Sequence, residues 1–261
     1  MVRVVLGLSY NGQAYQGWQS QRSGLTVQDK LEKALSSFTA QRVSTLCAGR
    51  TDAGVHALMQ VVHFDTERER DVHAWVRGTN ANLPRDIAVQ WAVLTTKDFH
   101  CRASAMSRRY AYVLLESPVR PSVEIGRVGW TFRELNHDAM RQAADTLLGE
   151  HDFTSFRASQ CQALSPVKKL LDIQLQKRGA YWRVEFEANA FLHHMIRNIM
   201  GCLVQIGQGK RPPEWMAEVL AARDRDAAAP TFSPDGLYFL GPRYAPQWNM
   251  PERTAAYDGL P

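Results

Sequence analysis

The stretch Gly49-Arg50-Thr51-Asp52-Ala53-Gly54-Val55-His56-Ala57 places one aspartate between two glycines, two residues after an arginine. Gly49 and Gly54 can take backbone angles closed to other residues, so the acid can be held on a tight loop with its carboxylate exposed. The charge of Arg50 favours an ionised carboxylate. Aspartates in such loops also close turns or cap helices, so this stretch alone leaves Asp52 open to a catalytic or a structural role.

The segments on either side of this loop are predicted to be strands. Residues 42–48 and 59–64 place the acid between two sheet elements, which is a common position for a catalytic group. The rest of the first half supplies further elements: a strand over 1–9, a helix from the Thr26 cap with one apolar face, a helix from Asp71 to about Leu83, and a strand over 87–94.

The second half has a similar order of predicted strands and helices, without detectable sequence repetition. Its expected elements are a strand over 107–116, a helix over 137–148, a hairpin of strands 170–177 and 181–188, a helix over 190–206, a helix through Trp215 to Ala222, and a strand over 237–240. Hairpins with helices set between them predict an α+β fold. We expect two similar α/β subdomains with mostly antiparallel or mixed sheets, residues 1–105 and 106–261, that meet at a basic cleft in one compact unit.

Composition points to a polyanionic partner. Of the 261 residues, 31 are Lys or Arg and 26 are Asp or Glu, which gives a formal charge of +5, and the 45% hydrophobic content supports a proper core. Arginines recur beside aromatics, as in Phe99-His100-Cys101-Arg102 and Arg108-Arg109-Tyr110-Ala111-Tyr112. Guanidinium groups hold phosphates and aromatic faces stack on unpaired bases, so this pattern favours RNA over a membrane.

The cysteines and the longest apolar stretch indicate the compartment. The four cysteines form no C-x-x-C pair, which argues against a disulfide framework or a thiolate metal site and favours a reducing cytoplasm. The apolar stretch from Ala190 to Gly207 is interrupted by histidines, an arginine and an asparagine, so we do not expect it to cross a bilayer.

Several familiar sites are excluded by spacing. Gly207-Gln208-Gly209-Lys210-Arg211 has Val204 where a phosphate-binding loop needs its first glycine and Arg211 where it needs Ser or Thr. His193 and His194 are adjacent, so on a helix they point about 100° apart and suit one metal poorly. No dinucleotide fingerprint, G-x-S-x-G elbow or zinc deaminase signature occurs. We therefore expect a reaction without cofactor or metal.

Five ordered motifs along nearly the whole chain resemble the tRNA pseudouridine synthase A family of pseudouridine synthases. They are the Asp52 stretch, the Arg109-Tyr110-Ala111-Tyr112 strand, Ser155-Phe156-Arg157-Ala158, Phe191-Leu192-His193-His194-Met195, and Ala229-Pro230 with Gly236-Leu237. The first motif is the most specific of the five. The resemblance implies a cytoplasmic isomerase that converts uridine to pseudouridine in the anticodon stem-loop of tRNA, at positions 38, 39 and 40, and that works as a homodimer.

The resemblance also implies roles for particular residues. Asp52 would be the catalytic nucleophile, Arg50 would fill the space left by a flipped base, Tyr110 would stack on the uracil, Arg197 would pair with Asp52, and Leu237 would form an apolar lid. Two segments would contact RNA: Phe99, His100, Cys101, Arg102 and Ala103 in the first half, and Gln160, Cys161, Gln162, Ala163 and Leu164 in the second.

The chain departs from the family pattern at three places. Leu58-Met59 is bulkier than expected, Ala163-Leu164 lacks polar side chains, and the spacing from Ala229 to Leu237 is longer than usual. Two other functions stay open at this point. A non-catalytic tRNA-binding protein would use the same arginines and aromatics, and a nucleotide-directed glycosidase with a carboxylate pair would release free base.

Overall fold

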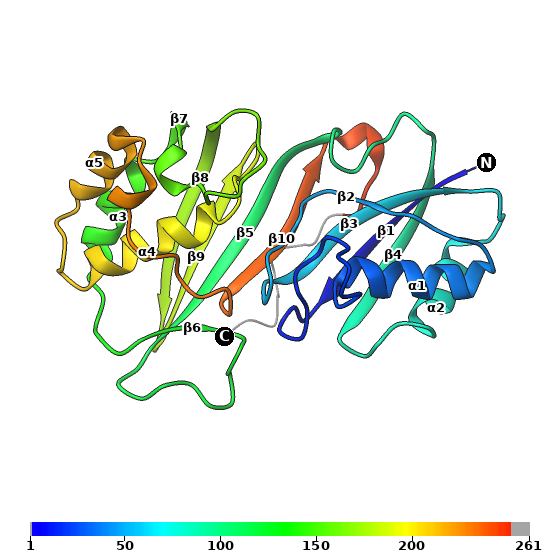
Figure 1. Ribbon diagram of the computed structural model, residues 1–261, viewed down its shortest axis with the longest axis horizontal. Coiled ribbons are helices and arrows are strands. Elements are labelled where there is room, and N and C mark those ends of the chain that lie inside the picture. Colours follow the sequence, from blue (N-terminus) through cyan, green and yellow to red (C-terminus); the bar gives the residue numbers. More distant parts are fainter. Residues whose placement is uncertain (1, 252–261) are drawn as a thin grey trace. The chain divides into compact units, whose positions relative to one another are not determined.

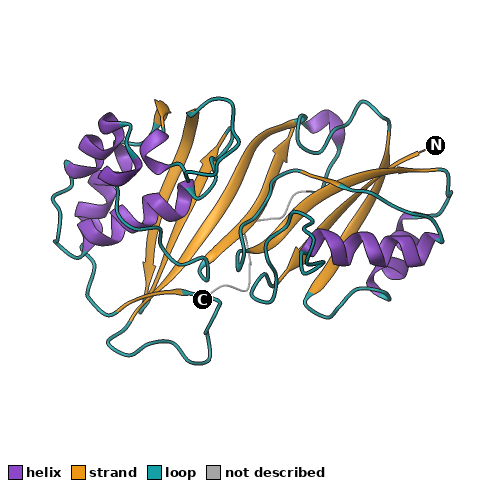
Figure 2. Cartoon of the chain, in the orientation of Figure 1, coloured by secondary structure: helices purple, strands orange, loops and turns teal. Residues whose placement is uncertain are grey.

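A computed structural model describes residues 2–251 of the chain, which divide into two units (Figures 1 and 2). The first unit contains residues 2–108 and the returning segment 238–251, and the second contains residues 109–237. Helices and strands alternate in both units, and most strand pairs are antiparallel. The α+β prediction is therefore confirmed. Within residues 2–251, no helix has the length and apolar character needed to cross a membrane.

The sheet of the first unit has the strand order β4-β1-β3-β10, with the short strand β2 paired to β3. The strands are β1 (Val2–Tyr10), β2 (Leu46–Cys47), β3 (His56–Thr66), β4 (Ile87–Thr95) and β10 (Leu237–Tyr244). β1 runs antiparallel to both β3 and β4, whereas β10 returns from the far end of the chain and pairs parallel with β3, Tyr238 opposite His56.

Two helices accompany this sheet on one face, as Figure 1 shows: α1 (Val27–Thr39) and α2 (Val72–Asn80). The Thr26 hydroxyl accepts a hydrogen bond from the Asp29 N–H at 3.2 Å, and the Asp71 carboxylate accepts one from the Ala74 N–H at 2.9 Å. Both predicted N-caps are confirmed, because each oxygen satisfies a backbone donor that the first helical turn leaves unpaired.

The sheet of the second unit has the order β5-β9-β8-β7, and β6 pairs parallel with β5. These strands are β5 (Ala105–Glu116), β6 (Gly129–Thr131), β7 (Gly149–Asp152), β8 (Val167–Arg178) and β9 (Tyr181–Ala188). β5 begins in the first unit and continues into the second. The predicted hairpin between β8 and β9 is present, and Gly179 turns it with φ of +58°.

Three α-helices belong to the second unit: α3 (His137–Asp145), α4 (Met195–Gly207) and α5 (Trp215–Ala222). α3 contacts α4, α5 and strand β8. At the end of β5, the Glu116 carboxylate accepts hydrogen bonds from Lys177 and from the Trp182 indole, both at 2.7 Å, and from the Leu135 N–H at 3.1 Å. Burial acts to raise the pKa of Glu116, but these hydrogen bonds outweigh it and lower that pKa.

Several element boundaries differ from the sequence prediction. The helix expected from Ala190 begins at Met195, because His194 has a φ of +63° that an α-helix cannot contain. The strand expected over 42–48 is reduced to Leu46–Cys47, and the helix expected to reach Leu148 ends at Asp145. The short strands β6 and β7 were not predicted, since three or four residues carry too little periodicity.

Candidate active site

The loop between β2 and β3 presents Asp52 at the surface of the first unit. The Val55 N–H donates to the Asp52 carbonyl at 3.1 Å, and Gly54 has a φ of +81°, so the chain turns back tightly after the acid. Thr51 is buried, Asp52 is half-buried and Arg50 is exposed. Backbone contacts thus fix the loop, and the Asp52 side chain is half-buried at its tip.

A second segment, residues 10–18, packs directly against this loop. The Trp18 N–H donates to the Thr51 carbonyl at 3.0 Å, and the Gly54 N–H donates to the Tyr15 carbonyl at 3.3 Å. A Cβ at Gly12 would overlap the Val55 carbonyl oxygen, and one at Gly17 would lie 2.7 Å from the Thr51 carbonyl oxygen. Glycine at these two positions allows the two backbones to approach each other this closely.

His56, at the start of β3, extends this packing. It is buried, its Nδ1 accepts a hydrogen bond from the Gly12 N–H at 3.0 Å, and its ring stacks on Tyr238 with centroids 4.6 Å apart. The histidine of the motif therefore ties three segments together: the loop, residues 10–18 and β10. This structural role was not predicted from the sequence.

Three predicted substrate-binding residues lie in the second unit. Tyr110 is on β5 with 8% of its surface exposed, and its ring meets Phe191 edge-on at 5.1 Å. Arg197, on α4, donates from Nε to the Phe232 carbonyl at 2.9 Å. Leu237, the first residue of β10, is 5% exposed. The aromatic ring and the guanidinium thus each have a contact within their own unit, and the leucine is buried.

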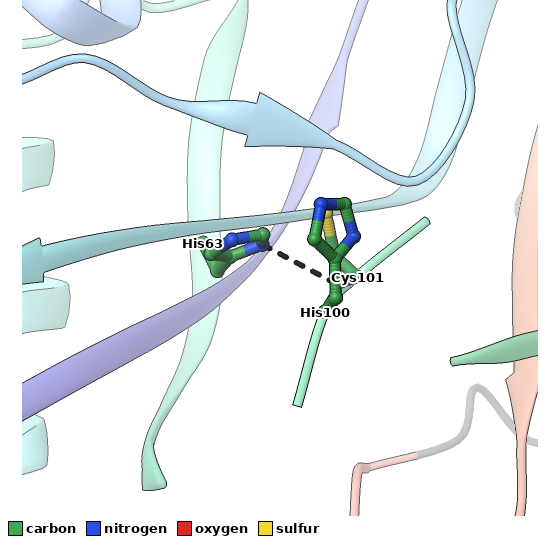
Figure 3. Close-up of side chains that lie close together, drawn as sticks. All are labelled: His63, His100 and Cys101. Carbon is green, nitrogen blue, oxygen red and sulfur yellow. Dashed lines mark hydrogen bonds between the residues drawn. The ribbon is translucent and has the colours of Figure 1, made fainter. Parts of the chain in front are cut away.

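The predicted RNA-contact segment 99–103 is anchored in the first unit (Figure 3). Phe99 and Cys101 are fully buried in the core, whereas Arg102 and Ala103 are exposed. The Cys101 N–H donates to His63 Nδ1 at 3.3 Å, its carbonyl accepts from the Tyr244 hydroxyl at 2.6 Å, and Arg3 donates to the Phe99 carbonyl at 2.6 Å. Only part of this segment is therefore available to a ligand.

The three labelled side chains of Figure 3 are of types that bind metals, and their ligand atoms lie within 4.8 Å of one another. The Nδ1 lone pairs of the two histidines and the thiol proton of Cys101 are already engaged, however. His63 Nδ1 accepts from Cys101, His100 Nδ1 accepts from the Arg102 and Ala103 N–H groups at 3.2 Å, and the Cys101 thiol donates to the Leu46 carbonyl at 3.2 Å. The cluster therefore serves as a hydrogen-bonded brace for segment 99–103.

Burial sets the protonation of this cluster. It lowers the pKa of His63 to about 4, with the charges of Arg3 and His100 acting in the same direction. Burial, together with the neighbouring Cys47, raises the pKa of Cys101 to about 12. At neutral pH both groups are uncharged, which suits their position beside the core.

The other predicted RNA-contact segment, 160–164, is open to solvent. The Arg157 guanidinium donates to the Cys161 carbonyl at 2.5 Å and to the Ala163 carbonyl at 3.0 Å, and the Leu164 side chain is fully exposed. Burial acts to raise the pKa of Cys161, but N–H donors of Ala163 and His193, with the charge of Arg157, outweigh it and lower that pKa.

Comparison with known proteins supports the resemblance of the motifs. The family model described as tRNA pseudouridine synthase matches residues 8–102 and 143–245. The chain belongs to this family. A protein named tRNA pseudouridine synthase A from Albidiferax ferrireducens is 70% identical over 260 residues, and one from Polaromonas naphthalenivorans is 70% identical over 264 residues. Another from Paracidovorax citrulli is 66% identical over 278 residues, and all three matches cover 100% of both chains. Pseudouridine synthases are isomerases, so the predicted class of enzyme is confirmed.

Proposed function

We propose that this isomerase converts uridine to pseudouridine in the anticodon stem-loop of tRNA, at positions 38, 39 and 40, with Asp52 as the catalytic carboxylate. The observation that carries the proposal is the Asp52 loop: an acid at the half-buried tip of a turn whose two flanks are fixed by buried backbone contacts. Such a loop holds a charged group in one place while leaving it reachable by substrate.

The chemistry needs an anionic group and no redox partner. The C1′–N1 bond of uridine breaks, a C1′–C5 bond forms, and the hydrogen that leaves C5 is balanced by a proton gained at N1, so atoms and oxidation state are conserved. A carboxylate with an ordinary pKa near 3.9 is ionised at neutral pH and can act on the sugar or on the ring. Attack on C1′, abstraction of a proton from the sugar and addition to the uracil ring are all open to it.

The base must leave its stack before it can turn over, which costs a few kcal/mol. In the proposal, Arg50 occupies the space that the base vacates; its side chain is exposed beside Asp52. Tyr110 stacks on the extruded uracil, Leu237 covers it as an apolar lid, and Arg197 pairs with Asp52 to keep the carboxylate ionised and aimed. The edge contact of Tyr110 with Phe191 and the tether of Arg197 to Phe232 would hold these two groups in place.

The two RNA-contact segments contribute differently in this proposal. In segment 99–103, the exposed Arg102 would bind phosphate, while the buried Phe99 and Cys101 position it. The Arg102 guanidinium also donates from Nε to the Cys47 carbonyl at 3.3 Å. In segment 160–164, the side chains of Gln160, Gln162 and Leu164 are themselves exposed. We further propose that the enzyme acts in the cytoplasm and that it is a homodimer. A mass of two chains in solution would support the homodimer.

The test is a product assay on unmodified tRNA, with carbodiimide labelling and primer extension to map each pseudouridine. Wild-type protein should create new stops at positions 38 to 40. Asp52→Asn should lose about a thousandfold or more in rate while its tRNA affinity stays within about threefold, because the change removes the charge and keeps the loop shape.

The matched control is Asp71→Asn in the same unit. Asp71 caps α2, and Asn caps a helix as well as Asp does, so this variant should keep full activity. An absence of stops in the anticodon arm with wild-type protein, or an active Asp52→Asn variant, would refute the proposal. Release of free uracil would instead identify a glycosidase.

A further inference from the structure

Three buried polar side chains of the first unit are hydrogen-bonded around the Asp52 loop. They are Tyr10 on β1, Gln60 on β3 and Thr51 in the loop, exposed by 4%, 0% and 7%. The Tyr10 and Thr51 hydroxyls are 2.7 Å apart. Gln60 donates from Nε2 to the Gly49 carbonyl at 2.6 Å and accepts from the Gly49 N–H at 3.4 Å. The two strands are thereby bonded to the loop at Gly49 and at Thr51.

The same three groups are linked to one another. Burial raises the pKa of Tyr10, and hydrogen bonds to Thr51 and Gln60 act in the opposite direction. The phenol is therefore neutral at neutral pH. Buried networks whose members satisfy one another fix one geometry, because any other arrangement leaves a polar group unpaired.

We propose that Gln60 and Tyr10 are positioning residues for Asp52. This inference rests on the proposed function, in which the Asp52 carboxylate acts on the substrate. The network holds the residue directly before Asp52 and the residue three positions before it, and the Trp18 N–H holds the Thr51 carbonyl as well. Asp52 follows Thr51 directly in the chain, so the place of its backbone follows from that of Thr51. A shift of about 1 Å at a reacting group can cost about a hundredfold in rate.

A purely structural role would be shared by any side-chain amide that pairs with the backbone in the same way, and the same unit contains a half-buried one. Asn80, at the end of α2, donates from Nδ2 to the Val89 carbonyl at 2.9 Å and accepts from the Val89 N–H at 2.7 Å. It pairs both amide atoms with one backbone residue, as Gln60 does with Gly49. Asn80 therefore provides a matched control for the loss of such a pair.

The experiment compares Gln60→Met with Asn80→Leu in single-turnover assays on unmodified tRNA, with tRNA affinity and melting temperature measured on the same samples. Both changes remove the amide and keep most of the side-chain volume. We expect both variants to melt at lower temperature. Only Gln60→Met should lose rate, by about 10- to 100-fold, with tRNA affinity within about threefold of wild type. Equal rates for the two variants, or a rate loss that tracks weakened tRNA binding, would overturn the inference.

A second set keeps the test valid if Gln60→Met does not fold. Thr51→Val removes the hydroxyl that is hydrogen-bonded to Tyr10, whereas Thr51→Ser keeps a hydroxyl at this position. The inference requires the single-turnover rate of the valine variant to fall and that of the serine variant to stay close to wild type. Asp52→Asn serves as the reference. If Asp52→Asn is active, the proposed function has failed, whereas an inactive Asp52→Asn beside a fully active Gln60→Met overturns only the positioning role.

Discussion

The two segments predicted to contact RNA, 99–103 and 160–164, differ in how the fold holds them. Each contains a cysteine. Cys101 is fully buried, with its N–H on His63, its carbonyl on Tyr244 and a pKa raised by burial. Cys161 is half-buried in a loop that Arg157 holds, and hydrogen bonds lower its pKa.

The two segments would therefore contact a substrate in different ways. The anchored segment can offer only its outward side chains, and its buried ones decide where those lie. The open segment exposes the Gln160, Gln162 and Leu164 side chains while Arg157 holds its backbone, so these side chains can adapt to a ligand. A segment close to the chemistry gains from the first arrangement, since catalysis depends on position, whereas a contact that only adds affinity can use the second.

Thiol alkylation should show the largest contrast between the segments. The thiolate is the reactive form, and Cys101 has a pKa of about 12 with no exposed surface, so iodoacetamide should modify Cys161 at least about a thousandfold faster at neutral pH. Peptide mass spectrometry after timed quenching measures both rates. Cys161→Ser should abolish the fast phase, and bound tRNA should slow it. Comparable labelling of the two cysteines would show that the segments do not differ as described.

Acid should destabilise the anchored segment first. The unfolded chain takes up a proton on His63 near its ordinary pKa of 6.5, whereas the folded chain does so only near pH 4. Because the unfolded state binds more protons between these values, stability is fully present above about pH 6.5 and falls as the pH drops toward 4. The loss from this one group should reach about 2 to 3 kcal/mol.

Urea denaturation at a series of pH values measures this slope. His63→Asn keeps an acceptor near the Cys101 N–H and does not titrate, so it should flatten the slope between pH 6.5 and pH 4. His73, which is exposed on α2, provides the control, and His73→Asn should leave the slope unchanged. A His63→Asn variant with the wild-type slope would rule out His63 as its source.

The sequence predicts the Asp52 loop, the candidate catalytic loop, better than it predicts what supports that loop. Asp52 stands out because its glycines and arginine are neighbours in the chain, and local spacing is visible in a sequence. Gln60 and Tyr10 look like ordinary strand residues, since the partners that give them a role lie 11 and 41 positions away. The parallel return of β10 onto β3 is non-local for the same reason.

The RNA-contact segments show a related limit. Phe99 and Cys101 alternate with His100 and Arg102, and that alternation is a signal of burial on one side. The family resemblance assigns all five residues of 99–103 to RNA and does not separate the inward from the outward ones. The late start of α4 has another cause. His194 has a left-handed backbone, which is uncommon for residues other than glycine, so the sequence does not predict it.

The smallest expected effect belongs to the open segment. Leu164→Ala should leave the free energy of unfolding within about 0.5 kcal/mol of wild type, because the side chain is fully exposed and loses no packing. If segment 160–164 contacts tRNA, the same variant should weaken tRNA binding by about two- to fivefold, as a peripheral apolar contact does. Val123, 87% exposed in the same unit but outside both segments, is the control, and Val123→Ala should change neither quantity. Filter binding measures the tRNA affinity of the wild type, Leu164→Ala and Val123→Ala. Equal affinities for both variants would remove Leu164 from the RNA-binding surface. An adaptable contact loop requires weaker binding by Leu164→Ala alone, at unchanged stability.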